Sequence, residues 1–226
     1  MKKEQAVENL DTLITNVEAA RLSISDHLIV KIVAISKYNS QEDIQTLYEA
    51  GQRAYGENKV QDLKEKAENL DEFPLEWHFV GRLQKNKINN LIDIAPSLFQ
   101  SLDSLELALE LNKKLGVKNK KMNCLLQINS AHEESKAGVK PEDAISIYNE
   151  IIENCPNIVL KGVMSIGAHV EDENEIKRSF GLTKNIFDSL IEKGARYCSM
   201  GMSSDYELAI KSGSNMIRVG SSLFKD

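Results

Sequence analysis

The chain has 226 residues, 42% of them hydrophobic, and its 28 Lys and Arg against 34 Asp and Glu give a net charge of −6. A chain of this size can bury one complete core, so we expect a single domain over residues 1–226. The two signs of charge are interspersed without a basic block, which argues against nucleic acid or an anionic membrane as a partner. Because MKKEQAVENL leads into no apolar segment and no later run approaches a membrane span, we expect a cytoplasmic protein.

The spacing of cysteines and histidines predicts no metal site. No C-x-x-C pair is present, so we expect buried thiols in a reducing compartment rather than disulfides. The cysteines are Cys124, Cys155 and Cys198. The histidines are equally scattered, at His27, His78, His132 and His169.

The first element is predicted to be a helix with no strand before it. Val7, Leu10, Ile14 and Val17 recur at helical spacing, and we expect them to form its buried face.

After this helix, short apolar runs alternate with helical patterns eight times. The predicted strands are 29–36, 53–55, 76–80, 98–101, 122–129, 158–164, 197–200 and 216–219. The predicted helices are 41–50, 59–69, 84–92, 104–115, 141–154, 173–192 and 204–212. Regular alternation of this kind predicts an α/β protein with a parallel sheet, and eight units close as a (β/α)8 TIM barrel. A doubly wound open sheet is the alternative, but its glycine-rich first turn is missing from KYNSQED.

Three local signals support the helix starts. Ser40 is followed three residues later by Asp43, and Ser204 by Glu207, which is the spacing of a capping box. Pro141 suits the first turn of a helix.

Small and polar residues follow the last two predicted strands. The segments are MGMSS at 200–204 and RVGSS at 218–222. In (β/α)8 barrels phosphate sites recur after strands seven and eight, where glycines let backbone N–H groups approach an anion. One such turn is weak evidence, but two in adjacent loops predict a phosphate site at this mouth.

Lys37 follows the first predicted strand, in KIVAISK. A lysine at such a position is ordinarily a solvated loop residue. At the exit of a buried strand, however, desolvation would supply the neutral amine that attack on a carbonyl needs, so Lys37 is a candidate Schiff-base lysine.

Two other polar residues leave alternatives open. Asn58, with Gly56 and Glu57, fits a tight turn with a helix cap as well as it fits a pocket. His78 fits a hydrogen-bonded histidine of the barrel interior equally well.

Six segments in chain order resemble one family. They are IVAISKY at 32–38, AGQRAYGENKVQD at 50–62, WHFVGRLQKNK at 77–87, LLQINSAHEESKAG at 125–138, GVMSIGA at 162–168 and SMGMSSDYELAIKSGSNMIRVGSSLF at 199–224. In these the chain resembles the pyridoxal-phosphate homeostasis proteins of the proline-synthase-co-transcribed type, and the combination is highly specific.

The resemblance implies a fold-type III barrel like the N-terminal domain of alanine racemase, with pyridoxal 5'-phosphate (PLP) held as a Schiff base on Lys37. It also implies that Arg218 faces the pyridine nitrogen or the phosphate, which would weaken the cofactor as an electron sink and restrain its chemistry. The cofactor-binding residues expected from it are Lys37, Asn58, His78, Met200, Ser203, Arg218, Gly220 and Ser221.

Departures from the family pattern are few. Ser221 stands where many relatives have a threonine, and the chain ends in Lys225-Asp226 without the usual glycine. Serine keeps the hydroxyl donor, so phosphate binding is little affected. Arg82 is a position that the family varies.

The resemblance favours a PLP-binding homeostasis protein, expected to be a monomer without catalytic residues, that holds PLP and delivers it to apo-enzymes. The alternative is a PLP-dependent enzyme such as an amino-acid racemase, but a racemase needs a second acid/base group from an extra domain for which 226 residues leave no room. A third interpretation is a lysine aldolase without PLP, for which Glu57 is the one carboxylate predicted near Lys37.

Overall fold

The predicted alternation folds into eight parallel strands that form a closed barrel. The computed structural model describes residues 1–131, 137–168, 170 and 172–225, so His132, His169 and part of the segment 125–138 lie outside the described residues. Neighbouring strands pair in chain order, and β8 closes the ring on β1 with Arg218 opposite Val33. The strands are β1 (Lys31–Ile35), β2 (Ala54–Glu57), β3 (Glu76–Phe79), β4 (Leu98–Leu102), β5 (Met122–Ile128), β6 (Ile158–Ser165), β7 (Tyr197–Ser199) and β8 (Met216–Val219).

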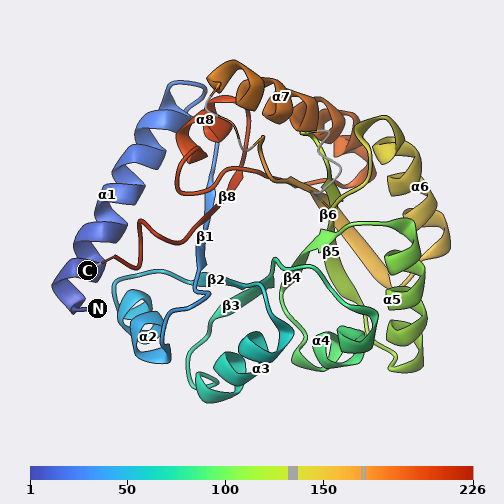
Figure 1. Cartoon of the computed structure of the whole chain (residues 1–226), viewed down its shortest axis with the longest axis horizontal. Coiled ribbons are helices and arrows are strands. Elements are labelled where there is room, and N and C mark those ends of the chain that lie inside the picture. The colour runs from blue at the N-terminus through green and yellow to red at the C-terminus, as the bar shows by residue number, and fades with distance from the viewer. Residues whose placement is uncertain (132–136, 169, 171, 226) are drawn as a thin grey trace.

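Helices surround this barrel on its outside (Figure 1). They are α1 (Lys3–Leu22), α2 (Gln41–Glu49), α3 (Val60–Asn69), α4 (Ile88–Ile94), α5 (Leu105–Val117), α6 (Ala144–Asn154), α7 (Glu173–Leu190) and α8 (Tyr206–Lys211). The barrel and its additional N-terminal helix confirm the predicted fold class. In the part of the chain that the structure describes, no helix has the length and apolar character needed to cross a membrane.

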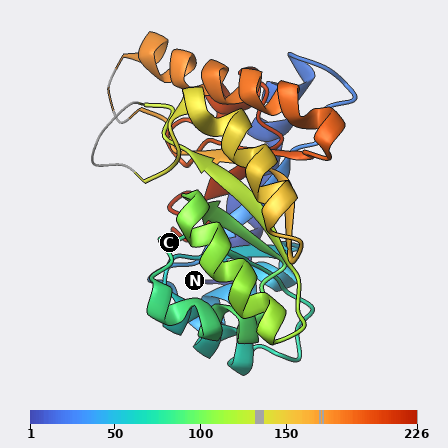
Figure 2. The same cartoon turned by 90° about the vertical axis from the view of Figure 1, so that its right-hand side faces the viewer.

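The N-terminal helix α1 occupies the place in the ring between α8 and α2 (Figure 1). It holds the end of the chain, because the Asn9 side-chain amide donates hydrogen bonds to the carbonyls of Leu223 (3.2 Å) and Lys225 (2.9 Å). The two termini therefore lie side by side in both views (Figures 1 and 2). In this way α1 supplies the outer cover next to β8 that the other strands receive from the helices following them.

The predicted buried face of α1 is wrong at two positions. Val7 and Ile14 are 38% and 42% exposed, whereas Leu10 and Val17 are buried as expected. The apolar residues of the buried stripe are Ala6, Leu10, Leu13, Val17 and Ala20. Alanines at both ends of the stripe let the helix approach its neighbours closely, and they give a weaker pattern in the sequence than large side chains do.

The predicted helix starts are confirmed in two of three cases. Ser40 and Asp43 form a reciprocal capping box on α2, and Pro141 opens a short 3-10 turn ahead of α6. The prediction at Ser204 is wrong, because α8 begins two residues later at Tyr206. There Asp205 instead accepts a hydrogen bond from the Met202 backbone at 2.6 Å, which shapes the β7–α8 loop.

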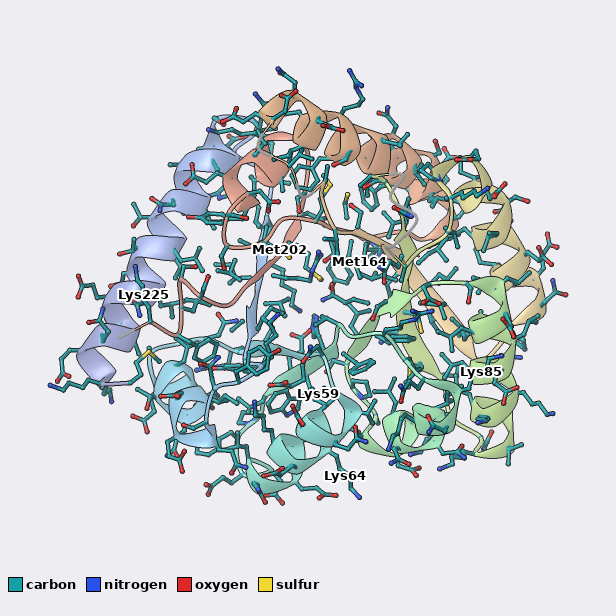
Figure 3. All side chains as sticks on the ribbon, viewed as in Figure 1. Lys59, Lys64, Lys85, Met164, Met202 and Lys225 are labelled. Carbon is teal, nitrogen blue, oxygen red and sulfur yellow. The ribbon has the colours of Figure 1, made fainter. Side chains whose placement is uncertain are left out.

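Apolar side chains pack in two layers. One lies between the strands and the helices, and the other fills part of the barrel interior. Met164 of the interior layer lies near the middle of the ring and Lys64 at its outer edge (Figure 3). The interior layer contains Val33, Ala54, Leu98, Leu125, Met164 and Met216. As expected, the cysteines are buried free thiols, at Cys124, Cys155 and Cys198.

Substitutions at two glycines, one crowded and one in open space, test how closely neighbouring strands pack in the barrel. Gly162 of β6 has φ +138°, and a Cβ there would lie 2.0 Å from the Tyr197 carbonyl oxygen. We expect Gly162→Ala to lower the free energy of unfolding by about 3 kcal/mol or more, since it adds strain and a backbone clash. Gly181 of α7 has open space around it, so Gly181→Ala should raise stability by about 0.5–1 kcal/mol. Urea unfolding measures both, and equal effects would contradict the packing at Gly162.

Candidate functional site

The loops after β7 and β8 are joined at the mouth of the barrel. The Gly220 N–H donates to the Ser203 hydroxyl at 3.2 Å, and the Arg218 N–H donates to the Gly201 carbonyl at 3.0 Å. The Gly220 carbonyl then accepts from the N–H groups of Leu223 (2.9 Å) and Phe224 (3.1 Å), which makes residues 220–224 a single helical turn. The first N–H groups of such a turn have no carbonyl partner within it and suit an anion.

Gly220 also brings this turn against the end of β1. A Cβ at Gly220 would lie 3.0 Å from the carbonyl oxygen of Ile35, so only a glycine lets the two backbones lie so close without displacement. Lys37 follows Ile35 by two residues. The candidate anion site and the candidate Schiff-base lysine therefore lie on adjacent strands at one mouth.

Unpaired polar atoms are found at this end of the barrel. Within the described residues, the Ser222 hydroxyl and the Asn58 side-chain carbonyl oxygen are buried without a hydrogen-bond partner. A buried polar atom without a partner costs about 1–3 kcal/mol, so such atoms commonly mark a binding site. Ser221, next to Ser222, is exposed. The residues present thus fit a bound group that carries a phosphate.

Arg218 lies inside the barrel directly below this turn. It is 5% exposed, its Nη1 donates to the Ser199 hydroxyl at 2.7 Å, and its Nη2 donates to the Ser165 carbonyl at 2.8 Å. Burial lowers its pKa to about 10, while the negative charge of Asp205 acts in the opposite direction. The guanidinium is therefore charged at neutral pH and is held by neutral oxygens.

A row of hydrogen-bonded polar side chains continues from Arg218 through the barrel interior. This row, called the polar file below, consists of Ser199, Gln100, His78 and Glu76. The Ser199 hydroxyl bonds to Gln100 Oε1 at 2.7 Å, and Gln100 Nε2 lies 2.7 Å from His78 Nδ1. His78 Nε2 lies 2.9 Å from a carboxylate oxygen of Glu76, to which Lys31 also donates. Burial lowers the pKa of His78, and the hydrogen bond from His78 helps to lower the pKa of Glu76 to about 2. His78 is thus the hydrogen-bonded interior histidine that the sequence allowed.

Lys37 is exposed, so the expected desolvation of its amine is wrong. It lies beyond the last residue of β1, next to Tyr38, whose φ is +70°. The amine lies 5.7 Å from the centroid of the Tyr38 ring, within cation–π range. Its surroundings at the mouth are therefore open to solvent.

A buried ion pair anchors the residue before Lys37. Glu57 is fully buried, and its Oε1 accepts from the Ser36 hydroxyl at 2.6 Å and from the Lys66 amine at 2.7 Å. The same amine donates to the Ser36 carbonyl at 2.9 Å. Glu57 therefore lies between the barrel and α3, with one oxygen of the carboxylate considered for an aldolase engaged by Ser36 and Lys66 and the other, Oε2, buried without a hydrogen-bond partner among the described residues.

Asn58 and Met200, two other predicted site residues, differ in their placement. Asn58 is half-buried just beyond β2, and its backbone carbonyl lies so close to Gly81 that a Cβ there would be 1.9 Å away. Met200 is fully buried in the apolar layer between strands and helices, and its backbone groups bond to Met216 and Ser214. This placement gives no support to a side-chain contact between Met200 and a ligand.

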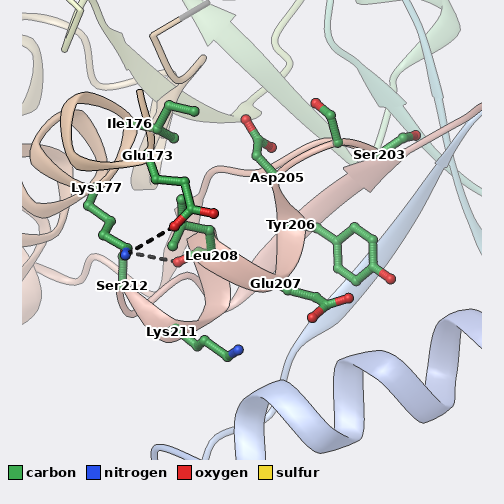
Figure 4. Close-up of a pocket in the computed structure, with 11 residues that line it drawn as sticks. Glu173, Ile176, Lys177, Ser203, Asp205, Tyr206, Glu207, Leu208, Lys211 and Ser212 are labelled. Carbon is green, nitrogen blue, oxygen red and sulfur yellow. Dashed lines mark hydrogen bonds and ion pairs between the residues drawn. The ribbon is translucent and has the colours of Figure 1, made fainter. Parts of the chain in front are cut away.

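A hollow on the outer side of the β7–α8 loop is visible in Figure 4. Ser203 and Asp205 form one edge, and Lys177 of α7 forms an ion pair with Glu173 at 3.3 Å on the other. A smaller hollow lies at the mouth itself between Val80, Gln127 and Ile166.

Comparison with known proteins places this barrel in a class. A model of the alanine racemase N-terminal domain matches residues 9–226. A pyridoxal phosphate homeostasis protein of Helicobacter pylori is 54% identical over 219 residues, which cover 97% of this chain and 98% of that protein. The chain therefore belongs to the pyridoxal phosphate homeostasis proteins within the alanine racemase N-terminal domain family.

Two solved structures are similar over nearly their whole lengths. An unknown protein from Bifidobacterium adolescentis has a TM-score of 0.93 at 30% identity, covering 98% of this chain and 95% of that one. PipY of Synechococcus elongatus, solved with PLP bound, has a TM-score of 0.83 at 28% identity, covering 97% of this chain and 100% of that one.

Sequence reasoning missed the residues behind Arg218. Gln100, Ser199 and Glu76 were predicted as parts of strands but not of the site. The signal that could have found them is alternation, because Glu76 and His78 occupy every second position of β3 and so point to one side. Polar residues at interior positions of a barrel strand are unusual, since branched apolar side chains normally fill that space.

The buried ion pair leads to a stability prediction. Lys66→Met leaves the Glu57 charge buried without its cation, and we expect a loss of about 3–5 kcal/mol of unfolding free energy. Lys64→Met is the matched control on the same helix, because Lys64 is 54% exposed and pairs with Glu68 at 3.6 Å; its loss should be about 0.5 kcal/mol or less. Urea unfolding compares the two, and a near-neutral Lys66→Met would contradict the role of the pair.

The lowered pKa of His78 predicts a pH dependence of stability. As pH falls through about 6.5, the unfolded chain takes up a proton at this position that the folded chain does not, so the free energy of unfolding decreases. We expect His78→Gln to make that decrease less steep between pH 7.5 and 5.5 (about one unit either side of the ordinary value). His27→Gln is the control, since the His27 side chain is 93% exposed. Identical slopes for the two variants would refute the assignment.

Proposed function

We propose that this chain binds PLP at the mouth of the barrel and takes part in intracellular PLP homeostasis as a carrier rather than an enzyme. The observation that carries the proposal is the close approach of Gly220 to Ile35, which sets a phosphate-type turn beside Lys37. The 54% identical relative is named for PLP homeostasis, and the PipY structure holds PLP. These names support the carrier role over a racemase.

In this proposal the phosphate is held by the N–H groups at the start of the turn at 220–224, with Ser203, Ser221 and Ser222 as hydroxyl donors. Arg218 faces the pyridine ring from inside the barrel. Lys37 would hold the cofactor through its amine, because PLP would supply the aldehyde with which an amine can form a Schiff base. When bound, PLP supplies a reactive aldehyde and an electron sink, and a charged arginine near its ring nitrogen weakens the latter.

The exposure of Lys37 supports reversible holding. The Lys37 amine is exposed to water, so a bond formed there would be open to hydrolysis, while the turn at Gly220 would hold the phosphate separately. Release of this kind suits delivery to apo-enzymes. We place this role in the cytoplasm, in keeping with the buried free thiols.

Lys37→Ala tests the covalent role. Since the phosphate contacts remain, we expect the variant to hold PLP about 10–100-fold more weakly (1.4–2.8 kcal/mol) and without the visible band of a Schiff base. Lys59→Ala, a change at an exposed lysine near the same mouth, should keep both the affinity and the band. Absorbance titration with PLP measures both. A Lys37→Ala protein that stays yellow and is still reduced by borohydride would refute this assignment.

A further inference from the structure

The direction in which the hydrogen bonds of the polar file are donated follows from the groups at its two ends, Arg218 and Glu76. A guanidinium has only hydrogen-bond donors, and an ionised carboxylate has only acceptors. Arg218 therefore donates to Ser199, which is left to donate its own proton to Gln100 Oε1. Gln100 then donates through Nε2 to His78 Nδ1, and His78 donates through Nε2 to Glu76.

The reverse orientation of Gln100 fails at the other end of the file. With its amide turned round, Gln100 would present an oxygen to His78 Nδ1, which would have to carry the proton. A neutral His78 would then set an unprotonated Nε2 against the Glu76 carboxylate at 2.9 Å, with no proton between them. Only one arrangement satisfies every member while His78 is neutral, and burial of His78 favours the neutral ring.

The lower end of the file is fixed by an ion pair near the amino ends of the strands. Lys31 donates to the same Glu76 oxygen that His78 contacts, and both side chains are about one-third exposed, at 29% and 36%. His78 and Gln100, by contrast, are fully buried. The negative end of the file is therefore set near solvent on the face opposite the mouth.

Packing alone does not account for these residues. Apolar side chains fill the interior on either side, including Leu98 two residues before Gln100 and Met216 two residues before Arg218. A buried polar network costs stability unless every member is satisfied, and when satisfied it holds its members in one geometry. The geometry held here is that of the Arg218 guanidinium, because Ser199 and Ser165 engage its two terminal nitrogens.

We propose that Gln100 is a positioning residue for Arg218, acting through Ser199 and fixed in its orientation by His78 and Glu76. The file turns the guanidinium toward the barrel mouth and keeps it there. This inference rests on the proposed function, in which Arg218 faces the bound PLP. The two polar side-chain atoms of Gln100, Nε2 and Oε1, are both hydrogen-bonded within the file.

A double-mutant cycle on PLP affinity tests the coupling. We expect Gln100→Leu to weaken PLP binding about tenfold and Arg218→Met about 100-fold, while the double variant matches Arg218→Met within about twofold because Gln100 acts only through Arg218. Gln52→Leu is the control, since the buried Gln52 donates to the carbonyls of Ile32 and Ala54 and has no bond to the file. It should leave PLP affinity unchanged.

Nitrogen NMR of the unaltered protein gives a second, independent readout. At pH 7 we expect His78 to be neutral with its proton on Nε2, both in the unaltered protein and in Gln100→Leu, because the Glu76 carboxylate needs a donor at that position. With that tautomer Nδ1 is an acceptor, so Gln100 must turn its Nε2 to His78 and its Oε1 to Ser199, which is the orientation that the proposal requires. Full additivity in the cycle, unchanged affinity in Gln100→Leu, or a proton on His78 Nδ1 would each overturn the proposal. If the unaltered protein takes up no PLP, the proposed function fails, and the tautomer still decides the direction of the file.

Discussion

A buried guanidinium sets the requirements for the rest of the barrel interior. Arg218 is charged at neutral pH but 5% exposed, and its terminal nitrogens donate to a hydroxyl and a backbone carbonyl rather than to a carboxylate. A buried charge is tolerated only where its hydrogen-bonding groups are satisfied. The polar positions of β3, β4 and β7 meet that requirement at the expense of the apolar filling typical of such barrels.

The mouth above Arg218 combines a tight half and an open half. On the tight side, Gly220 packs against the backbone of Ile35, and Ser203 ties the β7 and β8 loops together. On the open side, Lys37 is exposed, although just before it Glu57 binds the Ser36 hydroxyl and Lys66 binds the Ser36 backbone carbonyl. In the proposed function, a fixed backbone with an exposed amine would let a covalent bond form in a defined place and be hydrolysed again, as a carrier needs.

The fold could be predicted from the sequence because strand and helix periodicity repeats regularly along the chain. All eight strands fall within the predicted runs or within two residues of them. The buried face of α1 could not be predicted in this way, because alanines form part of its buried stripe. The start of α8 was misplaced because Ser204 has the spacing of a cap, whereas the Asp205 carboxylate engages the Met202 backbone instead.

The candidate site could be predicted only where its residues lie close together in the sequence. Glycines and serines after β7 and β8 mark the phosphate-type turn within short stretches of sequence. Lys37 is exposed beside Tyr38, whose φ is positive, and the link from Arg218 to Glu76 joins β7 and β8 to β3 and β4, which are far from them in the chain. Such features depend on three-dimensional closure, and residue type alone does not encode them.

The central claim is that Lys37, beside the turn at Gly220, holds PLP covalently. Its most direct test is peptide mass mapping of the purified protein after incubation with PLP and reduction by borohydride. The account predicts a pyridoxyl group on the peptide that contains Lys37. An adduct on another lysine, or no adduct after incubation with PLP, would contradict it.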